Sequence, residues 1–173
     1  DYNLEPDLAL AWQRDCQMAK VLSHTETDEK IELIGDLSMA YPDTTEKVIR
    51  KMTFLPKEGP NGVFTVEDEV IAKNEDFIKR FHIHMMNEPE IDGNVITIKH
   101  KGGALKCTVI EPENASITAI GGGDNRFTIV GIPIPSEKTE NRECGWGKVI
   151  ISPTTKAKEH KFKVKMEILD VEI

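Results

Sequence analysis

The sequence predicts an all-β fold, an antiparallel β-sandwich of short strands with one N-terminal helix. Apolar residues recur at every second position over most of the chain, which is the period of a strand with one buried face. Turn residues interrupt these runs about every ten residues, a spacing typical of sandwiches. No strand–helix–strand alternation is visible, which argues against a parallel sheet.

The first segment predicts a helix over about residues 6–23, and the sandwich is expected to follow over about residues 30–173. Pro6 stands near the first helical turn, where its missing amide hydrogen is not needed. Apolar residues in this segment are three or four positions apart, as on one face of a helix: Leu8, Trp12, Cys16, Ala19 and Leu22. The whole chain is expected to form a single domain.

Eight runs are predicted as strands because each alternates in polarity and ends at Gly, Pro, Asn or Asp. They cover residues 47–55, 62–70, 77–85, 95–98, 104–111, 126–131, 148–151 and 162–168. Gly121-Gly122-Gly123-Asp124 is predicted to be a turn that requires positive φ. It is not predicted to bind phosphate, because no Gly-Lys-Ser/Thr follows and the segment enters a strand.

Composition limits the function classes. The chain has 22 Lys and Arg against 30 Asp and Glu, and a net charge of −8 repels polyanions, so no nucleic-acid partner is predicted. No window is long and apolar enough for a membrane-spanning helix, so no membrane partner is predicted. Three widely spaced cysteines, Cys16, Cys107 and Cys144, match neither a disulfide framework nor a zinc ribbon. No cofactor is predicted in this chain.

His82 and His84 stand two positions apart in a predicted strand, so they share one face of it. Such a pair can supply two zinc ligands, but a zinc site needs more, and no further His, Cys or Asp stands close by in sequence. Arg80, on the same face, would repel a cation. We therefore predict no metal site and interpret the pair as part of a half-exposed sheet face.

Two charged patterns are open to functional interpretations. Lys161, Lys163 and Lys165 share one face of the last strand, where they could bind an acidic sugar or protect an exposed strand from association. The cluster Glu67-Asp68-Glu69 could hold calcium, but adjacent strand residues point to opposite faces. A solvated face is the favoured interpretation of this cluster.

Tyr41 is the candidate catalytic residue. A tyrosine can act as an acid or base when neighbouring cations lower its pKa, although a single tyrosine is more often a packed residue with a satisfied hydroxyl. No nucleophile elbow or other local catalytic signature occurs in the sequence.

Six segments read together carry a family resemblance: residues 34–41, 48–55, 81–94, 121–124, 145–153 and 162–171. In this order they resemble the C-terminal β-sandwich region of heparinase II/III-like polysaccharide lyases. The resemblance extends over nearly the whole chain. Gly131-Ile132-Pro133-Ile134-Pro135 departs from the more polar family segment.

The resemblance implies a fragment of a larger, bacterial, periplasmic or secreted enzyme that cleaves uronic-acid-containing polysaccharide, a glycosaminoglycan or alginate-like chain, by β-elimination. It implies two partner regions in the same enzyme: an N-terminal α/α toroid, which carries the main catalytic residues, and an upstream sheet, which carries a zinc ion. The isolated chain is then expected to be a scaffold or a wall of the substrate cleft rather than a catalyst. Exposed apolar faces would favour self-association, for example as a homodimer.

The basic candidates for contact with an acidic polysaccharide are Arg14, Lys20, Arg126, Arg142 and Lys148. Because the domain carries net negative charge, it is not expected to form the main basic groove for a heavily sulfated chain. The alternative is a carbohydrate-binding or structural module without a catalytic partner. Few aromatic residues are available for a sugar platform, which counts against the binding module.

Overall fold

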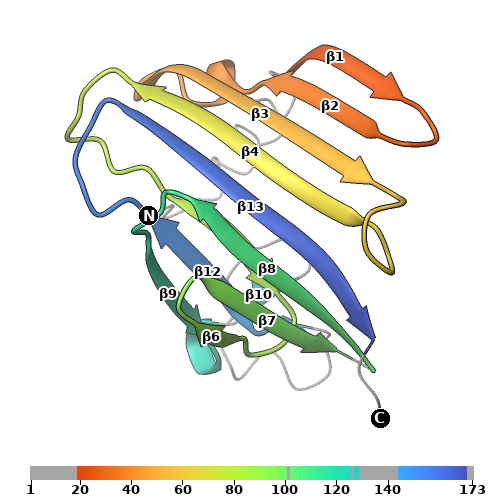
Figure 1. The fold of residues 1–173 in the computed structure, drawn as a ribbon. Helices are drawn as coiled ribbons and strands as arrows, with labels where there is room; N and C mark the ends of the chain where they lie inside the picture. Colours follow the sequence, from red (N-terminus) through yellow and green to blue (C-terminus); the bar gives the residue numbers. More distant parts are fainter. Residues whose placement is uncertain (1–18, 101, 126, 129–143, 171–173) are drawn as a thin grey trace.

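The computed structural model describes residues 19–100, 102–125, 127–128 and 144–170, and these form an antiparallel β structure (Figure 1). Eight strands form one large sheet in the order β1-β2-β3-β4-β13-β8-β7-β6. Their bounds are Lys20–Glu26 (β1), Ile31–Asp36 (β2), Thr45–Leu55 (β3), Val63–Ala72 (β4), Glu159–Asp170 (β13), Gly103–Glu111 (β8), Val95–His100 (β7) and Glu90–Asp92 (β6). The all-β sandwich prediction is confirmed.

A second sheet has three strands, in the order β5-β12-β9. Its strands are β5 (Phe81–Met85), β12 (Gly147–Ser152) and β9 (Ser116–Gly121). A short pair, β10 (Phe127–Thr128) with β11 (Cys144–Gly145), and two 3-10 turns, η1 (Ser38–Ala40) and η2 (Gly123–Asn125), complete the described elements. No helix among the described residues is long and apolar enough to cross a membrane.

The hydrophobic core lies between the two sheets. On β5, Phe81, Ile83 and Met85 are buried, and the ring of Phe81 stacks on Phe162 of β13 with centroids 6.1 Å apart. Valines and isoleucines at alternate positions of the other strands fill the rest of the core. The buried residues that form this cluster are Val66, Phe81, Ile83, Met85, Ile96, Ile98, Cys107, Val109, Val149, Ile151, Phe162 and Val164.

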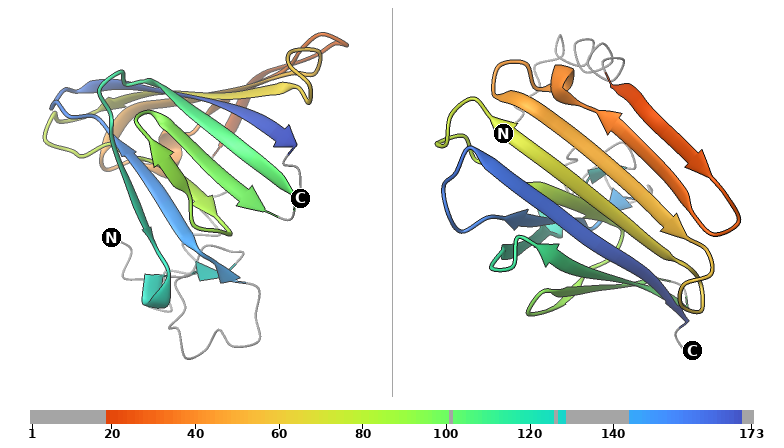
Figure 2. Two further views of the ribbon diagram at one scale, coloured as in Figure 1. Left: turned by 60° about the horizontal axis from the view of Figure 1, so that its bottom comes forward. Right: turned by 45° about the horizontal axis from the view of Figure 1, so that its top comes forward.

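The β1–β2 hairpin lies at the end of the large sheet opposite β6 and β7, away from the three-stranded sheet (Figures 1 and 2). Every residue of β1 is exposed, including the apolar Val21 and Leu22. This end of the large sheet therefore extends beyond the core.

The helix predicted over residues 6–23 is wrong at its end, since residues 20–23 belong to β1; residues 1–18 lie outside the described part. The register with β2 shifts between Val21 and Ser23, so β1 contains a bulge there. Pairing with β2 satisfies the backbone hydrogen-bonding groups of β1. The helix was predicted from the spacing of apolar residues, and this spacing contains no information about a partner strand.

Candidate functional site

The outward face of the three-stranded sheet carries the candidate site. Alternation on β5 turns His82 and His84 away from the core, because their neighbours Phe81, Ile83 and Met85 point into it. On β12 the same alternation buries Val149 and Ile151 and leaves Lys148 on the outward face.

The strand register brings the two histidines and the lysine together. Lys148 pairs directly with His84 on one side and with Ile120 of β9 on the other. Ile150, the next outward residue of β12, pairs with His82. The two imidazole rings lie edge to face with centroids 6.3 Å apart. The sequence separates Lys148 from the histidines by more than 60 positions, and only the pairing of β5 with β12 makes them neighbours.

No Asp or Glu occurs in any of the three strands of this sheet. Within the described part of the chain, neither Lys148 nor Arg80 forms an ion pair. The face is therefore locally cationic in a chain whose net charge is −8.

Desolvation and, after it, the neighbouring positive charges keep both imidazoles neutral near pH 7. Desolvation by the surrounding protein, then the charges of Lys148, His84 and Arg80, lower the pKa of His82 to about 4. Desolvation and Lys148 also lower the pKa of His84. Lys148 thus provides the permanent charge, and the imidazoles provide hydrogen-bonding groups that gain charge when an anion approaches.

The described residues contain no group of three or more His, Cys, Asp or Glu that could hold a metal ion. Two imidazoles beside a lysine and an arginine are a poor cation site and a suitable anion site.

Tyr41 lies on the turn after η1, with 45% of its surface exposed. Asp36 and Ser38 hold this turn: Ser38 Oγ donates to Asp36 Oδ1 (2.5 Å) and accepts from the Val48 amide (2.9 Å). The Ser38 carbonyl oxygen also accepts a hydrogen bond from the Tyr41 amide (3.1 Å). These hydrogen bonds fix the turn that connects β2 and β3.

Arg50 interacts electrostatically with Tyr41, but it is paired with Asp68. Arg50 makes a bidentate pair with Asp68, at 2.7 Å from Nε and 2.6 Å from Nη2, and its guanidinium lies 5.5 Å from the Phe81 ring centroid. The hydrogen bond from Asp68 raises the pKa of Arg50, burial opposes this, and Tyr41 makes a small contribution. Because the Asp68 carboxylate opposes the charge of this guanidinium, Arg50 can lower the pKa of a neighbouring tyrosine less than an unpaired arginine would.

The other sequence-predicted contact residues do not assemble into one patch within the described part. Lys20 begins β1 and pairs in register with Asp36 of β2, on the large sheet, whereas Lys148 belongs to the three-stranded sheet. Arg14, Arg126 and Arg142 lie outside the described residues.

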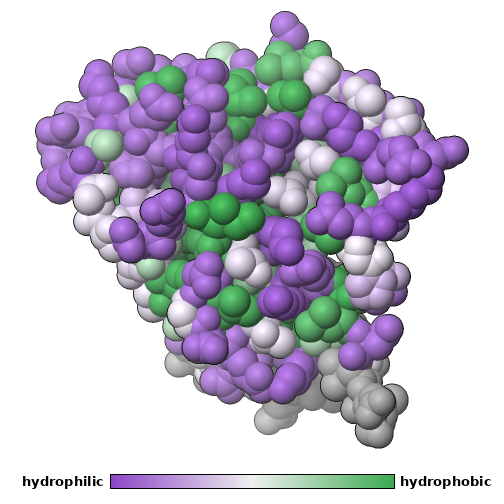
Figure 3. Space-filling view, in the orientation of Figure 1, coloured by the Kyte–Doolittle hydropathy of each residue, from purple (hydrophilic) through white to green (hydrophobic). Residues whose placement is uncertain are grey.

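The lysine stripe of the last strand has a structural explanation. β13 is a central strand between β4 and β8, so the suggested protection of a sheet edge is wrong. Lys163 and Lys51 both approach Glu67, at 3.4 and 2.8 Å, and Lys165 pairs with Glu167 at 3.1 Å. The outward face of the large sheet is accordingly hydrophilic with separate apolar patches (Figure 3), and glutamates neutralise several of its lysines locally.

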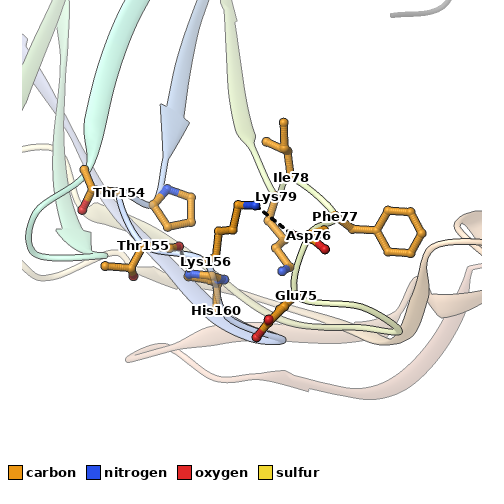
Figure 4. A pocket seen from close by; sticks show the side chains of 10 residues that line it. Glu75, Asp76, Phe77, Ile78, Lys79, Thr154, Thr155, Lys156 and His160 are labelled. Carbon is orange, nitrogen blue, oxygen red and sulfur yellow. Dashed lines mark hydrogen bonds and ion pairs between the residues drawn. The ribbon is translucent and has the colours of Figure 1, made fainter.

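A hollow of about 120 Å³ lies between residues 75–79 and residues 153–156 (Figure 4). Lys156 closes one side by pairing with Asp76 at 2.7 Å, and Lys79 donates to the carbonyl of Ala157. His160 is also bound to backbone, through Nε2 and the Thr155 carbonyl (3.1 Å). Since both cations are satisfied internally, we interpret this hollow as structural.

Comparison with known proteins gives a fold likeness. No family model matches the chain, and no curated protein does. A heparan sulfate lyase structure from Pedobacter heparinus is similar over 90% of this chain and 22% of its own length, with 15% identity and a TM-score of 0.61. A heparinase III structure has 12% identity and a TM-score of 0.60 over 89% of this chain and 22% of its own length. Another heparinase III structure has 13% identity and a TM-score of 0.57 over 88% of this chain and 21% of its own length.

These values confirm, at the level of the fold, the resemblance that the sequence segments indicate. The chain spans about a fifth of the length of the structures it matches. The likeness therefore describes a heparinase-like β-sandwich.

Proposed function

We propose that the chain is the C-terminal β-sandwich module of a heparinase II/III-like polysaccharide lyase that cleaves uronic-acid-containing polysaccharide by β-elimination. The observation that supports this most is the fold likeness over about nine-tenths of the chain to several heparinase III structures. In this proposal the enzyme is bacterial and periplasmic or secreted, where such substrates occur.

The elimination requires neutralisation of the uronate carboxylate, a base for the C5 proton and an acid for the leaving oxygen. Tyr41 is the catalytic candidate in the described part, and its cationic neighbour Arg50 is committed to Asp68. We infer that the toroid and the upstream sheet supply the catalytic groups. The module then acts as a scaffold and as one wall of the substrate cleft.

Exposed apolar side chains give the module a surface for the rest of the enzyme. Val21 and Leu22 on β1 are 62% and 49% exposed, on the part of the large sheet that the three-stranded sheet does not cover. Apolar groups in such number at an uncovered sheet end favour contact with another protein surface. In the isolated chain the same surface would favour a homodimer.

The test compares the 173-residue chain with the full-length gene product that contains it. Each is incubated with heparin, heparan sulfate, chondroitin sulfate and alginate, and unsaturated uronate is followed by its ultraviolet absorbance. We expect product from the full-length protein and none from the chain alone. Product from the chain alone that disappears in Tyr41→Phe would overturn the assignment of catalysis to the upstream regions. No product from either protein would overturn the lyase proposal.

A carbohydrate-binding module without a catalytic partner is the second candidate, favoured by the cationic sheet face. Such modules usually present open aromatic platforms. Trp146, however, packs closely over Gly121 rather than standing free, since a Cβ at Gly121 would meet its ring atoms. Saccharide binding by the full-length protein without any turnover would support this candidate over the lyase.

A further inference from the structure

The outward face of the β5–β12–β9 sheet brings two imidazoles beside a lysine that forms no ion pair with any described residue. Lys148 lies between His84 and Ile120, His82 lies beside Ile150, and Arg80 immediately precedes β5. We propose that this face binds an anionic group, a carboxylate or sulfate, of an acidic polysaccharide, with Lys148, His82 and His84 as the contacting side chains. The choice of a polysaccharide rests on the proposed function.

The spacing suits a chain of charged sugars rather than a single small ion. Two outward residues on one strand are about 7 Å apart, and directly paired residues on neighbouring strands are about 5 Å apart. His82, His84 and Lys148 thus form a triangle on the outward surface of the sheet. Ile120 and Ile150 flank them and offer apolar contact to the faces of sugar rings.

Charge complementarity favours an anionic occupant. On the large sheet, outward lysines such as Lys51 and Lys163 pair with Glu67, but the three strands of the small sheet contain no acidic residue. An anion that binds Lys148 therefore breaks no ion pair with any described residue. It meets a positive local potential although the whole chain is negative.

Bound anion and imidazole protonation should reinforce each other. With no ligand, desolvation and Lys148 hold the pKa values of His82 and His84 below the ordinary value. A neighbouring sulfate or carboxylate favours the charged imidazole and raises both pKa values. By linkage, the affinity should rise as the pH falls through the ligand-bound pKa values of the two histidines, with proton uptake on binding. Among the described residues, the charged or titratable groups that act on the His82 ring are Lys148 from β12, His84 and Arg80, and Lys148 also acts on His84.

The experiment uses a heparan sulfate hexasaccharide, with a neutral maltohexaose as the control ligand. Binding is measured by calorimetry at pH 7.5 and 5.5, and the imidazole resonances of His82 and His84 are followed by NMR in the unmodified protein. We expect binding of the sulfated ligand only, tighter at pH 5.5, with shifts of both imidazole signals toward the protonated form. The NMR measurement needs no variant and so does not depend on a substitution being tolerated.

Lys148→Met is the test variant and Lys163→Met is the matched control, because both lysines are outward on a central strand but only Lys163 pairs with a glutamate. Lys148→Met should weaken binding about three- to tenfold, and Lys163→Met less than about twofold. Equal affinity of Lys148→Met and the unmodified protein, or unmoved imidazole signals at saturation, would overturn the proposal. Tighter binding of duplex DNA than of the hexasaccharide would do the same.

This readout is separate from catalysis. If the full-length protein has no lyase activity but the hexasaccharide binds and shifts the imidazole signals, the proposed function is refuted and the proposed binding face is retained. Lyase activity unaffected by Lys148→Met, with no binding to the isolated chain, refutes the binding face and leaves the proposed function in place.

Discussion

Gly147 on β12 is the position where one added methyl group should disturb the three-stranded sheet most. Its neighbours in register are Met85 on β5 and Gly121 on β9. A Cβ at Gly147 would stand closer than 3.0 Å to three backbone atoms, namely the carbonyl carbon (2.9 Å) and oxygen of Ile120 and the Cα of Gly121. Because the obstacles are backbone rather than flexible side chains, β12 and β9 must separate to admit it.

The expected cost follows from the size of that separation. Moving two paired strands apart by on the order of 1 Å is an overpacking defect, which costs about 1–3 kcal/mol and sometimes more. Replacing Gly by Ala also restricts the unfolded chain, which returns about 0.4–1 kcal/mol. We expect Gly147→Ala to lower the free energy of unfolding by about 2 kcal/mol. The melting temperature should then fall by about 4–8 °C for a chain of this size.

Gly35→Ala is the matched control, since Gly35 is also in a strand and the nearest atom to its added Cβ is the Lys20 carbonyl oxygen at 3.8 Å. The measurement is thermal unfolding followed by circular dichroism for both variants. Gly35→Ala should melt within about 3 °C of the unmodified protein. If Gly147→Ala and Gly35→Ala have the same melting temperature, the close approach of β12 and β9 does not constrain residue 147 and the reasoning fails.

Three further predictions concern other parts of the fold. Asp68→Ala should lower the free energy of unfolding by about 1–3 kcal/mol in urea titrations, because it leaves Arg50 without its carboxylate beside Phe81; an Asp68→Ala, Arg50→Met double variant that is no more stable would contradict this. The hydrogen bond from Ser38 lowers the pKa of Asp36, so this carboxylate stabilises the fold above its ordinary pKa of 3.8 and stops doing so as the pH falls through the lower folded-state value; NMR titration should show a higher Asp36 pKa in Ser38→Ala. Burial raises the pKa of Cys107 to about 11, so in a variant with serine at the other two cysteines its thiol should react with a disulfide reagent at pH 8 only after denaturation.

The core strands were predictable because each buries one face. Alternating apolar residues mark β5 and β12, with Ile83 and Met85 on one and Val149 and Ile151 on the other, and these side chains are buried. The turn at residues 121–124 was predictable for a similar local reason, since Gly122 and Gly123 adopt positive φ. In both cases the information lies within a few neighbouring residues.

The outer strands could not be found in the same way. All residues of β1 are exposed, so the sequence of this strand shows no buried apolar face. Its stability comes from backbone pairing with β2. No strand was predicted at β9, whose Ile117 and Ala119 pack against the core while Ile120 is exposed. A strand that is stabilised mainly by pairing with another strand can be predicted only when that partner strand is known.

The candidate site shows the same limit. The sequence singled out Lys148 as a basic residue and the His82–His84 pair as a sheet face, but only the register of β12 with β5 unites them. One signal was present in the sequence: residues 81–85, 116–121 and 147–152 all lack acidic residues, in a chain with 30 of them. Charge counted strand by strand would have drawn attention to this sheet.

Net charge is therefore a weak guide to what this fold can bind. The value of −8 argues against a polyanion groove only if the charges are evenly spread. On the large sheet, Glu67 neutralises the outward lysines Lys51 and Lys163 at contact distance. Because the acidic residues are absent from the small sheet, Lys148 keeps its field there. The strength of that field, rather than the sum over the chain, decides whether an acidic sugar can bind.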